Sequence, residues 1–91
     1  MQSFRLAQSD QVQAAIREFN HDGLDLVYLQ TPTGFNVLYK FLVVVKVAFW
    51  GTQPAIRIES VKLGATTLFV GSDAVQLAGE LIMLLVKEHN V

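Results

Sequence analysis

Apolar residues recur with a helical period near each end of the chain. They are Val12, Ala15, Ile16 and Phe19 in the first segment and Ala74, Leu77, Ala78, Leu81, Leu84 and Leu85 in the second. This spacing predicts amphipathic helices over about 10–21 and 74–87. Ser9 and Ser72, each followed by an aspartate, have the character of N-caps, and Gly23 suits the left-handed residue that ends many helices.

Between the two helices the pattern changes to extended runs of β-branched, aromatic and leucine residues. The runs predict strands over 24–29, 36–50, 55–63 and 66–70, separated by turns at 31–34, 51–54 and 64–65. At about 3.3 Å per residue the second strand would approach 50 Å, far beyond the usual length. We therefore expect it to be bent, bulged or shared between two subunits.

The predicted order is α-β-β-β-β-α. It corresponds to a two-layer α+β fold, in which a four-stranded antiparallel meander is flanked by an N-terminal and a C-terminal helix. No repeat or linker divides the chain, and 91 residues suffice for one hydrophobic core, so we expect a single domain over 1–91.

Alternation along 36–50 separates two faces. The odd positions are apolar throughout and predict the core face: Val37, Tyr39, Phe41, Val43, Val45, Val47 and Phe49. The even positions mix aliphatic side chains with lysines and a tryptophan, and Arg57 on the next strand belongs to the same face. The candidate binding residues are Lys40, Leu42, Val44, Lys46, Trp50 and Arg57.

Three interpretations of this mixed face remain open. Its cations are ordinary solubilising charges whose stems cover aliphatic neighbours, or two copies of the chain pack through it, or it contacts another partner. Composition favours an interface, because 52% of residues are hydrophobic and only 16% are charged, against roughly 25% charged in an average soluble chain. The same composition excludes intrinsic disorder.

Charge is unevenly distributed along the chain. The net charge is −1 and both ends are acidic, whereas residues 26–72 carry four lysines and arginines against one glutamate. Lys40, Lys46, Trp50, Arg57 and Lys62 therefore suggest an alternative function as a single-stranded nucleic-acid binder. A pI near 6.0 and so few cations make this alternative weaker than a protein-binding function.

Chemistry-bearing residues are sparse. The chain has no cysteine, and the spacing of its histidines and carboxylates predicts neither a metal site nor a cofactor. His21 beside Asp22 and Asp25 is the one conceivable acid–base group, but a histidine at a helix C-terminus is already explained by the helix dipole. We expect no enzymatic activity.

The sequence also bears on location. The N-terminal residues lack the pattern of a signal peptide, and the apolar run 41–50 is shorter than the roughly 20 residues of a spanning helix. We expect a cytoplasmic, non-catalytic protein-binding or adaptor domain that acts as a homodimer.

Overall fold

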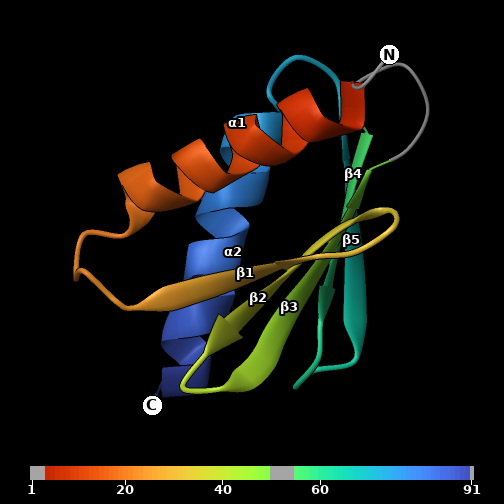
Figure 1. Ribbon diagram of the computed structural model, residues 1–91. Coiled ribbons are helices and arrows are strands. Elements are labelled where there is room, and N and C mark those ends of the chain that lie inside the picture. Colours follow the sequence, from red (N-terminus) through yellow and green to blue (C-terminus); the bar gives the residue numbers. More distant parts are fainter. Residues whose placement is uncertain (1–3, 50–54, 91) are drawn as a thin grey trace.

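The computed structural model describes residues 4–49 and 55–90, with side chains over 8–49 and 55–89. Within these residues two helices enclose five strands along the chain (Figure 1). They are α1 (Phe4–Phe19), β1 (Leu26–Gln30), β2 (Gly34–Tyr39), β3 (Leu42–Phe49), β4 (Ala55–Ser60), β5 (Ala65–Val70) and α2 (Ala74–Asn90). The strands form one antiparallel sheet in the order β1-β2-β3-β4-β5. The α+β meander between two helices is confirmed, with five strands in place of four.

Helix α1 begins earlier than the sequence pattern predicted. Ser9 lies inside the helix, where its Oγ accepts a hydrogen bond from Gln13 Nε2 at 3.3 Å, so its assignment as an N-cap was wrong. The preceding residues are arginine, leucine, alanine and glutamine, which all have high helix propensity. The helix therefore continues toward the N-terminus without needing an apolar periodicity there.

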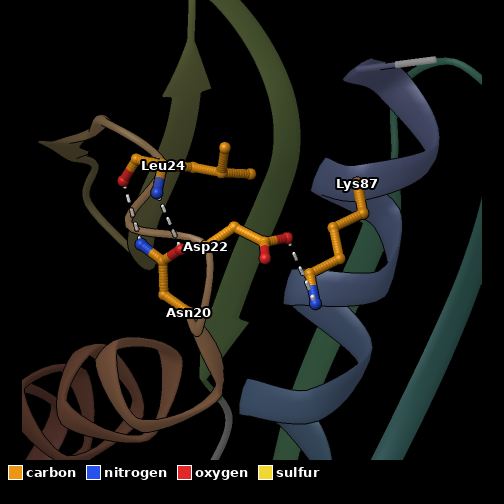
Figure 2. A network of polar contacts seen from close by, with 4 residues as sticks. All are labelled: Asn20, Asp22, Leu24 and Lys87. Atoms are coloured by element: carbon orange, nitrogen blue, oxygen red, sulfur yellow. Dashed lines mark hydrogen bonds and ion pairs between the residues drawn. The ribbon is translucent and has the colours of Figure 1, made fainter.

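The chain leaves α1 through a turn held by one side chain. Asn20 Oδ1 accepts a hydrogen bond from the Leu24 N–H, and Asn20 Nδ2 donates one to the Leu24 carbonyl, both at 2.9 Å (Figure 2). Gly23 has a φ of 65°, the left-handed conformation expected of it. A single amide thus holds both ends of the turn that leads into β1.

The largest difference from the predicted elements is a chain reversal inside 36–50. Strand β2 ends at Tyr39 and β3 begins at Leu42, and the intervening Lys40 and Phe41 have positive φ angles of 54° and 68°. Two-residue hairpin turns with two positive φ angles are of type I′ and prefer asparagine and glycine. Neither residue is present, so the sequence carried no turn signal here.

A β-bulge explains why the apolar alternation looked continuous. Val37 lies opposite Val45, whereas the next residue, Leu38, lies opposite Val43, which leaves Val44 as an extra residue in β3. The two-residue turn shifts the alternation by one position, and the bulge shifts it back. Odd-numbered residues therefore face the helices in β2 and again in β3 from Val45 onward.

The hydrophobic core lies between the sheet and the two helices. Helix α1 packs against α2 and β2, and α2 packs against β3, β4 and β5. The buried hydrophobic strand residues are Phe35, Val37, Tyr39, Val44, Val45, Val47, Phe49, Ile56 and Ile58. Most of the predicted core face is confirmed, but Phe41 is 98% exposed in the turn, and Val43 faces away from the helices, because the reversal and the bulge displace both.

The helices approach each other closely at one glycine. A Cβ placed on Gly79 would lie 2.6 Å from the Ala15 Cβ and 2.9 Å from its carbonyl carbon, well inside a van der Waals contact of about 3.5–4.0 Å. Helix α2 buries Ala78, Ile82 and other small or aliphatic side chains, while leaving outward-facing leucines exposed. Neither helix in the described part of the chain is long and apolar enough to cross a membrane.

Candidate functional site

One face of the sheet carries no helix, and we call it the open face. In an antiparallel sheet, residues paired across neighbouring strands point to the same side, so the register defines its members. They are Val27, Leu29, Gly34, Asn36, Leu38, Val43, Lys46, Ala48, Ala55, Arg57, Glu59, Thr66, Leu68 and Val70. All five strands therefore contribute to this surface.

The centre of the open face is polar. Lys46 lies directly opposite Glu59, and Arg57 Nη2 is 3.9 Å from Glu59 Oε1. Together with Thr31 and Asn36 these side chains line a shallow hollow of about 280 Å³. Because Arg57 and Glu59 both remain well exposed, their ion pair adds little stability. The centre of the open face thus exposes two cations and one anion.

The margins of the open face are apolar. On β1, Val27 and Leu29 are 54% and 50% exposed, and on β5, Leu68 and Val70 are 59% and 63% exposed. Burying one such side chain stabilises an assembly by about 1.5–3 kcal/mol at most. Covering all four would therefore contribute substantially to the free energy of association. Contiguous exposed apolar side chains rimmed by polar residues mark interaction sites, and each margin offers one such aliphatic pair beside the polar centre.

Only part of the predicted binding set meets on this face. Lys46 and Arg57 lie there on neighbouring strands and line the same hollow. Val44 was wrongly placed: as the extra residue of the bulge it turns inward and is 3% exposed. Sequence alternation alone could not detect the inserted residue.

The other predicted residues lie elsewhere. Lys40 is in the hairpin turn, with its Nζ 5.3 Å from the centre of the Tyr39 ring. Leu42 is exposed, but the register places it opposite Tyr39 on the helix side of the sheet. Lys62 lies in the β4–β5 turn, and Trp50 is outside the described residues. The basic sheet face inferred from the sequence is therefore reduced to Lys46 and Arg57.

A second surface lies at the β2–β3 turn. Phe41 projects into solvent beside an apolar hollow of about 570 Å³, whose lining includes Leu24, Val27 and Leu38. Left-handed φ angles at non-glycine residues cost roughly 1–2 kcal/mol each, so the turn is held by the strands that it connects. No motif in the sequence singled out Phe41, because aromatic residues inside an apolar run predict a strand.

The open face thus combines apolar margins, a polar centre and an adjoining apolar hollow. No family model matches the chain, and no curated protein or solved structure matches it. The interpretation of this surface therefore depends on its own residues. An arrangement of this size, spread over five strands, suits contact with a macromolecule better than enclosure of a small ligand.

The histidine considered from the sequence has no catalytic surroundings among the described side chains. His21 is exposed, and its neighbour Asp22 pairs with Lys87 of α2 at 3.8 Å (Figure 2). This ion pair connects the loop after α1 to the end of α2, which is a structural role. Within residues 8–49 and 55–89, no group of three or more histidine or carboxylate side chains is placed to hold a metal ion.

Proposed function

We propose that this chain is a small, non-catalytic protein-binding domain that acts as a homodimer and presents its open face to a partner protein. The observation that carries the proposal is the exposure of Val27, Leu29, Leu68 and Val70 on the side of the sheet without helices. Covering these side chains removes apolar surface from water, which favours association. The mixed charges between them supply orientation rather than affinity.

The arrangement of charges supports binding rather than catalysis. Glu59 lies between Lys46 and Arg57, so opposite charges neutralise each other across β3 and β4. The polar centre would form complementary hydrogen bonds with a partner, as the polar part of an interface does. The cytoplasmic location expected from the sequence stays a prediction.

The homodimer is tested by the molar mass in solution. Light scattering on a sizing column, at low and moderate salt, should give a mass near twice 10.1 kDa at both salt concentrations. Apolar contacts persist as ionic strength rises, whereas contacts between charges weaken. A mass of one chain over the whole accessible concentration range would overturn the homodimer.

The partner surface is tested by site-specific photo-crosslinking. A photoreactive amino acid replacing Leu29 on the open face should cross-link one defined protein in cells that produce the chain. The matched control replaces Gln76, which is exposed on α2. Equal cross-linking from both positions, or none from Leu29, would contradict the proposed surface.

Single-stranded nucleic acid is the competing ligand, since Lys46 and Arg57 are diagonal neighbours across β3 and β4 on the open face. Fluorescence anisotropy with labelled oligonucleotides separates the two functions. Binding that weakens with salt and is lost on Lys46→Glu would favour nucleic acid and displace the protein-binding proposal. Under our proposal the oligonucleotides do not bind at low ionic strength.

A further inference from the structure

Strand β5 is an edge strand without the usual protection against pairing with another chain. It pairs with β4 on one side, so a row of backbone N–H and C=O groups faces away from the sheet. Its six residues, Ala65–Val70, include no charged residue and no proline, and its pairing with β4 runs without a bulge. Charges, prolines and bulges are the devices by which edge strands normally avoid association.

Charges at the two ends of β5 favour a second copy of this chain as the occupant. Exposed Lys62 lies three residues before the strand, and exposed Asp73 lies three residues after it. When two β5 strands run antiparallel, the start of one meets the end of the other. Each Lys62 then lies beside the partner copy's Asp73, and the two-fold symmetry repeats this pairing at both ends of the contact.

The register of such a pair follows from the faces of the strand. Residues directly opposite each other in an antiparallel pair point to the same side, so the two-fold axis lies midway between a residue and its own copy. With the axis at Leu68, this leucine meets its own copy on the open face, flanked by Thr66 against Val70. On the helix side Thr67 meets Phe69. This register brings the most exposed aliphatic side chains of β5 together.

We propose that two copies join through β5, antiparallel about an axis at Leu68, to form one continuous ten-stranded sheet. The proposal specifies the interface of the homodimer and therefore rests on the proposed function. It moves Leu68 and Val70 from the margin of one open face to the middle of a doubled one. A six-residue strand spans only about 20 Å, which places the contact among the smaller interfaces. The dimer is therefore weak enough for its dissociation to be followed over a concentration series.

The first test introduces a charge at the axis. Leu68→Lys brings two lysines together and should raise the dimer Kd at least about tenfold. The matched control is Leu29→Lys, which places the same charge on the open face of the opposite edge strand, β1. Sedimentation velocity over a concentration series should show dissociation of the first variant and retention of the dimer by the second. Circular dichroism checks that both variants stay folded.

The second test uses the absence of native cysteine. Opposite residues of an antiparallel pair lie about 4.5–5.5 Å apart at Cα, a separation that a disulfide spans. Leu68→Cys should therefore form a disulfide-linked dimer rapidly on mild oxidation, whereas Leu29→Cys should not. The charge pair gives a third check at low ionic strength: Lys62→Asp weakens the dimer, and adding Asp73→Lys restores it.

The possible outcomes separate this inference from the proposed function. A wild-type monomer overturns the homodimer and the β5 interface together. A wild-type dimer that survives Leu68→Lys, or that Leu29→Lys dissociates instead, overturns the β5 interface alone. Cross-linking of Leu29→Cys in preference to Leu68→Cys has the same meaning. In these last cases the homodimer stands and another surface forms it.

Discussion

Replacing Gly79 by alanine should destabilise the fold, although alanine is the better helix former. Position 79 lies within α2 and faces Ala15 of α1. In an exposed helix interior this change would stabilise by about 1 kcal/mol. Here the added methyl group would meet the Ala15 side chain at 2.6 Å and its carbonyl carbon at 2.9 Å. Both atoms of Ala15 are fixed by the backbone of α1, so no side-chain rotation can relieve either contact.

The net effect follows from two opposing contributions. Restoring normal contact distances requires the helices to separate by about 1 Å at this point. Overpacking of this kind typically costs about 1–3 kcal/mol, and its upper range applies where backbone must move. After subtraction of the helix-propensity gain, Gly79→Ala should lower the free energy of unfolding by about 1–2 kcal/mol.

Urea denaturation followed by circular dichroism at fixed protein concentration measures this difference. The pair Gln76→Gly and Gln76→Ala, at an exposed position of the same helix, calibrates the propensity contribution. Adding Ala15→Gly to Gly79→Ala should recover part of the loss, because it removes the 2.6 Å contact but not the backbone contact. A Gly79→Ala protein more stable than wild type by the calibrated amount would refute the close helix contact.

Two further predictions concern the hairpin and one tyrosine. Replacing Lys40 by asparagine and Phe41 by glycine supplies residues that favour positive φ and should raise stability by about 1–2 kcal/mol in thermal unfolding; an unchanged or lower stability would contradict the type I′ turn. Burial raises the pKa of Tyr28, and the charge of Arg17 offsets part of the increase. Folding therefore favours the neutral phenol of Tyr28. The resulting contribution to the free energy of unfolding is complete below about pH 10 and is lost as pH rises through the higher folded pKa. Above about pH 10 the free energy of unfolding of Tyr28→Phe should fall less steeply with rising pH than that of the wild type. Parallel curves of unfolding free energy against pH would contradict this linkage.

The fold class could be predicted from the sequence because periodicity reports which residues a helix or strand buries. The sequence predicted one strand where the structure has two, β2 and β3. The reason is that two local features have opposite effects on the apolar alternation and cancel. Lys40 and Phe41 reverse the chain without turn-forming residues, and Val44 restores the alternation that the reversal shifts. Strand length was the remaining clue, since a 15-residue run greatly exceeds the usual strand.

The candidate site was predictable to a smaller extent. Lys46 and Arg57 share the open face because both keep the alternation of their own strands. The exposure of Leu68 depends on which strand lies at the edge of the sheet and on which face of the sheet the helices cover, and neither follows from local pattern. The exposure of Phe41 was not predicted, because an aromatic side chain in an apolar run normally indicates burial. Its positive φ places it in the hairpin turn, where the side chain is exposed.

Packing of α1 against α2 brings the first and last described elements of the chain into contact, whereas each strand pairs with its neighbours in sequence. During synthesis the hairpins have their partners within a few residues, but α1 has no helix to pack on until α2 has emerged. Local contacts generally form faster than distant ones, so closure between the chain ends should be a late step of folding. A nascent chain that stops before residue 74 would hold a complete sheet whose helix-facing side is largely uncovered, and that intermediate is the one most in need of protection from aggregation.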